Sequence, residues 1–412
     1  MSAHIRRDLR MFYLYRLLSA AYLFVPAQIA FLLQRGLTWT EIFVLNSVFN
    51  AVLVAFEVPT GALADRFGRR FAMMLGSLSM ALAFLIYYVS SSFALFALAE
   101  GTFALGMTLT SGPDSAYLYD LLKSEGQARR YTAHEGTASS FKHIGMTVAF
   151  AVGGFLGQRQ VALPYLCAAG VCVLAAVCAA CLREAHPVRR LQVQRWGGYV
   201  PHMSGALKTA LRGQRLRYAI LYSSLIFVLL RVSLWMYQPY LSDAGLDLGA
   251  IGLVFAGLYG TAALCSHNVQ KIRAQFRGAS IYWVLPAVLG ATYLLLGRFV
   301  AVWGVALLVL QKAVDGIYSP LTKELLNREI EDSSQRATVL SVESMVRRIA
   351  FGLFAPACGV LFDHWGRPAA FYLCALTGGL GALALLLRRR AAAHLEGTSL
   401  TAEPAAGRVT RL

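Results

Sequence analysis

The sequence contains little charge for its length. Of its 412 residues only 14% are Asp, Glu, Lys or Arg, whereas 57% are hydrophobic. A typical soluble domain carries about 25% charged residues. A soluble protein of this composition would lack the polar side chains that cover a water-exposed surface. The shortage of charge therefore excludes an ordinary soluble fold and predicts an integral membrane protein.

Sequence motifs that are typical of several other classes of protein are also absent. The chain has no GxxxxGK[ST] loop and no GxSxG or HExxH pattern, so we expect neither an ATP-driven pump nor an enzyme. The net charge of +17 comes without a nucleic-acid-binding module, so no nucleic-acid partner is expected. The seven cysteines lie in apolar stretches and form no ligand cluster with histidine. We therefore expect no disulfide framework, no metal and no cofactor.

What the chain does have is a series of long apolar stretches. A membrane-spanning helix needs roughly 20 mostly apolar residues, and twelve stretches meet this length. The candidate spans are 11–34, 41–61, 70–90, 92–119, 132–158, 161–182, 217–242, 247–269, 278–297, 300–325, 337–362 and 369–388. The sequence thus predicts an all-α membrane protein with twelve transmembrane helices.

The basic residues are distributed unevenly between the loops. If the N-terminus is cytoplasmic, the loops on the opposite side contain only Arg35, Arg159, Arg298 and Arg367. Cationic residues concentrate on the cytoplasmic side of membrane proteins, so we expect both termini in the cytoplasm. The compact loops are typical of a protein of the bacterial inner membrane.

A basic central loop divides the spans six and six, and the two halves resemble each other. YLCA occurs at 165–168 and again at 372–375, and other weak matches share nearly the same offset. Duplicated halves of this kind bracket a binding site near the membrane midplane. We expect an N-terminal six-helix bundle at 1–185, a cytoplasmic linker with an amphipathic helix at 186–216, a C-terminal six-helix bundle at 217–390, and a disordered cytoplasmic tail at 391–412.

Four charges stand in one short segment between the second and third spans, GALADRFGRR at 61–70. This segment resembles the signature of the major facilitator superfamily, and the resemblance extends to the twelve spans and the basic central loop. It implies a secondary active transporter that works by alternating access, and we expect this transporter to be a monomer. It also implies a latch between the halves that holds the outward-facing state. In that latch Asp65 faces the start of the eleventh span and Arg69 pairs with Asp120. The predicted latch residues are Gly61, Asp65, Arg66, Gly68, Arg69, Arg70 and Asp120.

A second resemblance lies in the fifth span. GMTVAFAVGG at 145–154 retains Gly145, Gly153 and Gly154 of an antiporter signature of the superfamily, with Ala149 and Phe150 in place of its glycine and proline. Small residues at these positions permit close helix packing in lipid. The partial match favours export by antiport.

Charged residues inside the spans are candidates for the substrate site, because a charge at bilayer depth is costly unless it has a function. The predicted substrate-binding residues are Arg231, Lys142, His143, Arg347, Arg348 and Lys312, with Gln28, Trp235, Tyr237 and Gln238 lining the same site. The basic excess predicts an anionic or carboxylate-bearing substrate. The alternative, that these bases form salt bridges between helices, stays open.

Acidic residues inside the spans are candidates for proton coupling. Glu100, Asp114 and Glu343 are the best placed, although Glu343 can also pair with Arg347 four residues later on the same helical face. The resulting hypothesis is proton-coupled efflux of a small organic molecule, such as a siderophore or a drug-like compound. An uptake symporter for an organic anion and a non-transporting receptor or scaffold are the alternatives.

Overall fold

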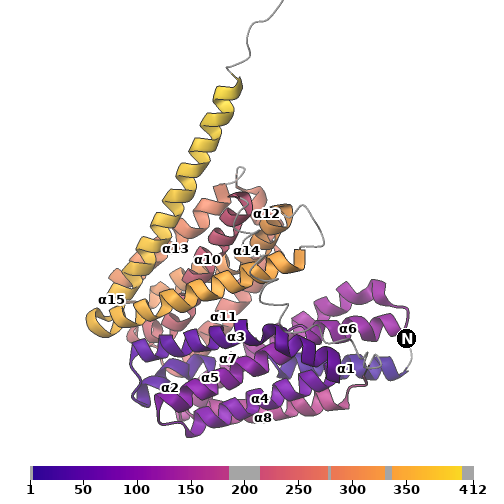
Figure 1. Ribbon diagram of the computed structural model, residues 1–412. Helices are drawn as coiled ribbons and strands as arrows, with labels where there is room; N and C mark the ends of the chain where they lie inside the picture. The colour runs from indigo at the N-terminus through magenta and orange to yellow at the C-terminus, as the bar shows by residue number, and fades with distance from the viewer. Residues whose placement is uncertain (1–2, 185–213, 277–279, 330–335, 401–412) are drawn as a thin grey trace, which may run out of the picture.

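The computed structural model describes residues 3–184, 214–276, 280–329 and 336–400, and these ranges form helices without any strand (Figure 1). The helices of the first half are α1 (Ala3–Leu18), η1 (Val25–Ala27), α2 (Gln28–Gln34), α3 (Trp39–Phe67), α4 (Arg69–Val89), α5 (Phe93–Thr110), α6 (Pro113–Ser124), η2 (Ala128–Arg130), α7 (Tyr131–Arg159) and α8 (Leu163–Cys181). Those of the second half are α10 (Gln214–Asp243), α11 (Leu248–His267), α12 (Val269–Ala274), α13 (Ser280–Arg298), η4 (Val302–Gly304), α14 (Val305–Glu329) and α15 (Arg336–Leu400). The predicted all-α membrane fold is confirmed.

Nine helices in the described ranges are long and apolar enough to cross a membrane. One of them, Val339–Leu387, has 49 residues, about twice the length that a single crossing needs. The predicted first span falls on α1 and α2, which are short, and the fifth falls on the more polar α7. The count of twelve crossings therefore stays a prediction.

Two predicted spans contain breaks that hydropathy does not reveal, and a third break falls where two predicted spans meet. The first span is interrupted over residues 19–24, between α1 and η1, where the sequence predicts one continuous helix. The fourth is broken between α5 and α6, where Gly112 has φ 99° and Pro113 begins the next helix. At Gly366 the backbone of α15 turns at φ 77°. A positive φ is accessible to glycine at little cost, and proline at the first helical position needs no hydrogen-bond acceptor for its nitrogen.

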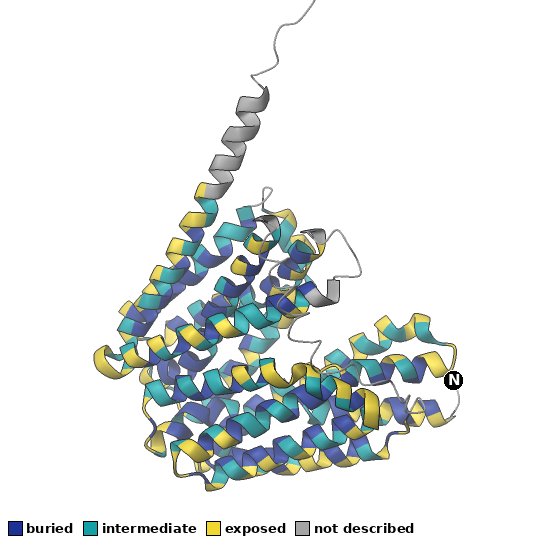
Figure 2. Ribbon diagram, in the orientation of Figure 1, coloured by how far each residue is buried: buried dark blue, intermediate teal, exposed yellow. Residues whose placement is uncertain are grey.

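The two halves lie against each other as separate groups of helices, α1–α8 and α10–α15 (Figure 1). Buried residues are concentrated within each group and along their contact, while the outer faces carry exposed side chains (Figure 2). Many of these exposed side chains are large and apolar, including Leu82, Leu98 and Leu174. An apolar outer surface is what a protein surrounded by lipid tails requires.

The halves are closed against each other at one end, which we call the far face. Asp363 on α15 accepts hydrogen bonds from the backbone N–H groups of Trp39 (2.9 Å) and Thr40 (2.8 Å), and from the Thr40 hydroxyl (2.6 Å). The Trp39 ring stacks on Phe362 with centroids 3.9 Å apart. An aspartate of one half thus caps the N-terminus of α3 in the other half, where the helix dipole favours a negative charge.

The opposite end, which we call the motif face, contains residues 61–70 and the N-terminus of α1 (Figure 1). The predicted amphipathic linker helix lies outside the described residues, and so do residues 401–412. Residues 391–400, predicted to be disordered, instead continue α15 to Leu400. Alanine, leucine and arginine dominate the sequence just before and within this stretch, and they are strong helix formers.

Candidate functional site

A central cavity of about 200 Å³ lies between the halves. Its wall is mostly apolar and aromatic, with three amide side chains and two charged ones. The lining residues are Tyr22, Phe24, Val25, Gln28, Ile29, Asn46, Phe49, Glu100, Phe103, Met107, Met146, Phe150, Arg231, Leu234, Trp235, Gln238 and Tyr259. A mostly apolar pocket with a few placed polar groups is typical of a small-molecule site.

Four of the predicted binding residues, Gln28, Arg231, Trp235 and Gln238, are among these lining residues. Gln238 also connects the halves, because its Oε1 accepts a hydrogen bond from the backbone N–H of Ala30 at 3.0 Å. Tyr259 was not predicted, since an aromatic residue on an apolar helix gives no signal that distinguishes a cavity wall from packing.

The two charged lining residues, Glu100 and Arg231, come from different halves. Glu100 is only 4% exposed, and neither residue forms an ion pair within the described part of the chain. The Nε of Arg231 is buried without a hydrogen-bond partner. An unpaired charge that is kept away from water is unfavourable. Arg231 is therefore suited to binding a ligand, and Glu100 is suited to binding a ligand or a proton.

A second cavity of about 320 Å³ adjoins the first on the side of the motif face. It shares Met146 and Tyr259 with the central cavity. The lining residues are Arg16, Ser139, Lys142, His143, Met146, Tyr259, Ala262, Ala263, Ser266, Asp315, Gly316 and Ser319. The predicted Lys142 and His143 therefore lie in a compartment different from that of Arg231.

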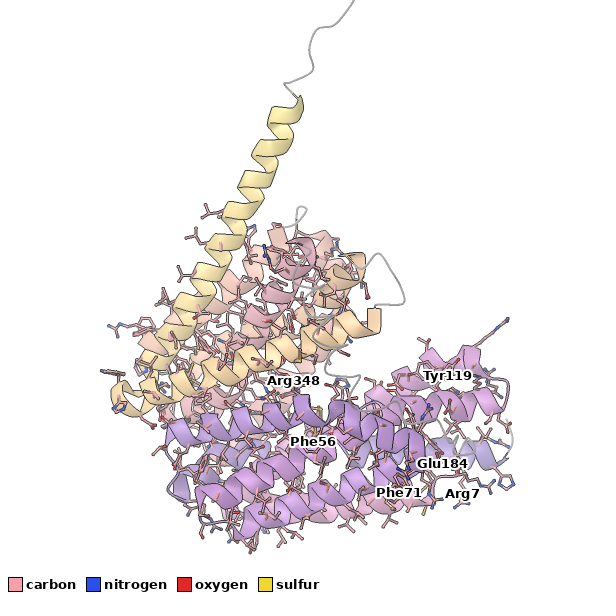
Figure 3. The ribbon with its side chains drawn as sticks, in the orientation of Figure 1. Arg7, Phe56, Phe71, Tyr119, Glu184 and Arg348 are labelled. Carbon is pink, nitrogen blue, oxygen red and sulfur yellow. The ribbon has the colours of Figure 1, made fainter. Side chains whose placement is uncertain are left out.

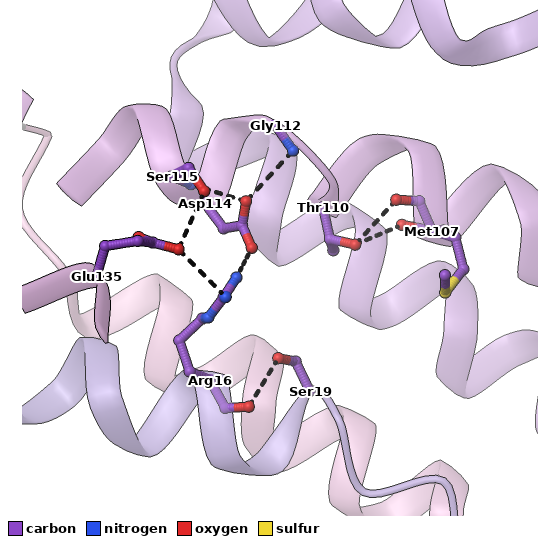
Figure 4. Close-up of polar contacts among 9 residues, drawn as sticks. Arg16, Ser19, Met107, Thr110, Gly112, Asp114, Ser115 and Glu135 are labelled. Atoms are coloured by element: carbon purple, nitrogen blue, oxygen red, sulfur yellow. Dashed lines mark hydrogen bonds and ion pairs between the residues drawn. The ribbon is translucent and has the colours of Figure 1, made fainter. Parts of the chain in front are cut away.

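Arg16 and Asp114 form the most enclosed ion pair of the first half (Figure 4). The Arg16 side chain is 9% exposed and also lies 3.6 Å from Glu135. Asp114 accepts hydrogen bonds from the backbone N–H groups of Gly112 (3.2 Å) and Ser115 (2.7 Å), at the break between α5 and α6. Asp114 thus has a structural partner on every side, which weakens its candidacy as the coupling acid.

Lys312 is buried in the second half. Its Nζ lies 2.9 Å from Asp315 and 4.1 Å from the centre of the Tyr259 ring. The ring of Tyr237 is 5.9 Å from the same nitrogen. Neither Lys312 nor Tyr237 lines either cavity. The two predicted binding residues instead support the wall behind Tyr259.

Glu343, Arg347 and Arg348 form a polar group on α15. Glu343 accepts a hydrogen bond from the Ser223 hydroxyl and pairs with Arg347 at 3.3 Å. Arg348 faces the first half (Figure 3), where its Nη1 donates a hydrogen bond to the Asn50 Oδ1 at 3.4 Å. None of these three residues lines either cavity. Arg347 is thus paired within its own helix and not by a salt bridge between helices.

The charges of the 61–70 segment act within the first half in this structure. Arg69 forms an ion pair with Asp120 and donates to the carbonyl oxygen of Ala116 at 2.5 Å. Arg70 donates to the carbonyl oxygen of Ala180. Asp65 and Arg66 are exposed and have no ion pair among the described residues. The predicted contact of Asp65 with the other half is absent from the described ranges, because the halves meet at the far face instead.

Of the two glycines among the predicted latch residues, only the second lies at a turn. Gly61 lies inside α3, and a Cβ atom there would meet nothing within 4 Å. The chain turns only at Gly68, which has φ 98°. Next to it, Glu184 accepts a hydrogen bond from the backbone N–H of Arg69 at 3.1 Å, at the start of α4. Glu184 was not predicted, because it follows a different helix and no short-range pattern links it to Arg69.

The three glycines of the partial antiporter signature all lie at close backbone contacts of α7. A Cβ atom on Gly145 or Gly153 would overlap the carbonyl of Leu17 or Leu23, respectively. One on Gly154 would lie 2.8 Å from the Cα of Gly252, in the other half. The fifth predicted span is thus pressed against both the broken first span and the second half.

A family model described as Major Facilitator Superfamily matches residues 14–276. The chain belongs to the major facilitator superfamily. It is thus a membrane transporter by family and fold.

Several known proteins resemble this member of the superfamily. The MFS-type transporter YxaM of Bacillus subtilis (strain 168) is 21% identical over 359 residues, which cover 86% of this chain and 88% of that one. The tetracycline resistance protein, class C, of Escherichia coli is 33% identical over 110 residues, 26% of each chain. The crystal structure of the nucleoside transporter NupG superposes with a TM-score of 0.77 at 12% identity, covering 94% of this chain and 99% of that one.

Proposed function

We propose that this transporter exports a small organic compound with an anionic or carboxylate group, such as a siderophore or a drug-like molecule, in exchange for protons. The observation that carries the proposal is the central cavity, where Arg231 has no ion-pair partner among the described residues and Glu100 lines the same wall. A guanidinium binds a carboxylate in two parallel hydrogen bonds. A buried carboxyl group can take up a proton when its charge has no partner.

The ion pairs of the structure favour one of the three candidate acids as the proposed coupling site. Asp114 is paired with Arg16, and Glu343 with Arg347. Glu100 forms no such pair within the described ranges and lies at the cavity wall. We therefore assign the exchanged proton to Glu100 and structural roles to the other two acids.

We propose that the transporter acts as a monomer in the bacterial inner membrane and exports its substrate from the cytoplasm. The bias of Lys and Arg places both termini, and so the motif face, in the cytoplasm. The closed far face then leaves the second cavity, with its exposed His143 and Ser266, on the cytoplasmic side. The partial antiporter signature and the resemblance to a resistance protein over a quarter of the chain favour export.

The test begins with ligand binding to the detergent-purified protein. Organic anions, iron-free and iron-loaded siderophores, cationic drugs and sugars are screened for an increase in the apparent Tm, since a ligand of the folded state raises it. An anion that stabilises the wild type is then assayed for flux in liposomes with an imposed pH gradient. We expect Arg231→Met to lower its affinity by about tenfold or more, while Arg298→Met, an exposed control, leaves the affinity unchanged.

Proton coupling is tested with a separate variant. Glu100→Gln should retain binding but abolish the response of flux to the pH gradient, because the amide cannot carry a proton. Glu125→Gln, in an exposed position of the motif face, should respond as the wild type does. Flux that ignores the gradient in the wild type would exclude proton coupling, and the absence of any flux would leave a receptor or scaffold as the function.

A further inference from the structure

Two cations that lack ion-pair partners among the described residues lie in two adjoining compartments. Arg231 lines the central cavity, and Lys142 lines the second cavity. Neither forms an ion pair within the described ranges of the chain, whereas the other bases lining or supporting these walls do, Arg16 with Asp114 and Lys312 with Asp315. Each compartment thus offers one basic group of its own to a ligand.

The acids near the two compartments are mostly occupied. Asp315, the acid in the wall of the second cavity, is held by Lys312 at 2.9 Å. Glu135 lies 3.6 Å from Arg16 and lines neither cavity. In the central cavity the remaining acid is Glu100, which becomes neutral when it carries the proton assigned to it above. In that state the two cavities together present a net positive wall.

Helix α7 sets the spacing between the compartments. Lys142, Met146 and Phe150 follow one another at intervals of four residues, so each lies about 6 Å further along the same face of the helix. Lys142 lines only the second cavity, Met146 lines both, and Phe150 lines only the central one. Met146 and Tyr259 line both compartments and so lie where the two adjoin. The ring centroids of Phe150 and Tyr259 are 4.8 Å apart. A flat apolar group can pack against the exposed side of such side chains.

We propose that the substrate is an elongated compound with two acidic groups separated by a flat apolar or aromatic body. One acidic group binds Arg231, the body lies along Met146, Phe150 and Tyr259, and the other acidic group binds Lys142. This assignment rests on the proposed function, since it places the transported anion in the same site, and it adds the number and the separation of the anionic groups.

His143 offers a second polar contact to the acidic group that binds Lys142. Its Nδ1 donates a hydrogen bond to the carbonyl oxygen of Ser139 at 2.7 Å, which leaves Nε2 as the ring nitrogen that can meet a ligand. His143 follows Lys142 directly, so the two side chains point about 100° apart around the helix. Lys142 is therefore the main contact and His143 the lateral one.

The test compares two matched acids on the full-length protein in detergent. Biphenyl-4,4′-dicarboxylate has an acidic group at each end, and biphenyl-4-carboxylate has the same body with one. We expect the diacid to bind about tenfold more tightly than the monoacid, since one hydrogen-bonded charge pair contributes about 1.5–3 kcal/mol. Lys142→Met should remove this difference and leave the affinity for the monoacid unchanged. Lys142→Arg should keep it, and so should Lys123→Met, which removes an exposed lysine of the motif face.

Several outcomes would overturn the proposal. Equal affinity of the wild type for the two acids would overturn it. A Lys142→Met variant that lowers the affinity for both acids by the same factor, or for neither acid, would also overturn it. Binding of neither acid would exclude this substrate class as well. The proposed function fails by a different measurement, namely liposome flux that does not respond to a pH gradient, so the two failures are distinguishable.

Discussion

Two glycines of the 61–70 segment differ in what their backbones require. Gly68 has φ 98° and ψ 149°, a conformation that is nearly restricted to glycine. A Cβ atom there would also lie 2.7 Å from a carboxylate oxygen of Glu184. Gly61 is helical and has open space around it. The same residue type thus has a structural function at one position of the motif and none that the structure shows at the other.

This difference predicts unequal effects of alanine. Gly68→Ala should destabilise the protein by about 1–3 kcal/mol, the usual cost of a side chain in such a backbone conformation. Gly61→Ala should be neutral or slightly stabilising, because alanine is a better helix former than glycine by up to about 1 kcal/mol. The apparent Tm of the two purified variants is the measurement, and equal losses in both would contradict the assignment.

At the scale of a helix, α4 begins beside a carboxylate from the end of α8. Glu184 accepts the hydrogen bond of the Arg69 N–H group, one of the four donors that a helix start leaves unpaired. Partial burial raises the pKa of the Glu184 carboxyl group above its usual range, against the opposing effects of the Arg69 and Arg70 backbone N–H groups and of their side-chain charges. The carboxylate thus gains a contact and loses hydration at the same time.

The direction of this shift gives a pH prediction. A raised pKa means that the folded state binds the proton more tightly than the unfolded state, so the contribution to stability is present at low pH and is lost as the pH rises through the folded pKa. The apparent Tm of the wild type should therefore fall relative to that of Glu184→Gln as the pH rises from about 4 toward neutrality. Parallel curves, or a wild type that gains on the variant, would show that the hydrogen bonds outweigh the burial.

At the scale of the whole molecule, closure of the far face depends on a helix cap that crosses between the halves. Asp363 of α15 binds the first two residues of α3. Further along the same helix pair, the Ser47 hydroxyl donates to the carbonyl oxygen of Gly352 at 2.9 Å. A transporter that exposes its cavity to the other side has to break the contacts of Asp363 in each cycle.

We expect Asp363→Ala to lower the population of molecules with a closed far face. Its matched control is Asp247→Ala, because Asp247 caps α11 within one half by accepting from the Ala250 N–H at 2.7 Å. Distances between spin labels placed on the two halves at the far face are the measurement. A longer distance in the first variant but not in the second supports the assignment, and identical distances in both would contradict it.

One contact between nearby residues was predictable from the sequence, and one between distant residues was predictable from the family resemblance. The Glu343–Arg347 pair follows from a spacing of four residues on a helix, and the Arg69–Asp120 pair followed from the family signature. Contacts of Glu184 with Arg69 and of Asp363 with Trp39 were not predictable, because they join segments that are far apart in the chain. The same limit applies to Lys142 and Arg231, which are both basic residues inside predicted spans but line different cavities.

The sequence by itself determined the class of the protein, its division into two helical halves and the family to which it belongs. These properties depend on hydropathy along the chain and on one short motif, and both are local. Only the tertiary structure decided which intramembrane charges are paired, which end of the molecule is closed and how the space between the halves is divided. Those properties depend on the direction in which each side chain points and on what the other half places opposite it, and no local pattern encodes either.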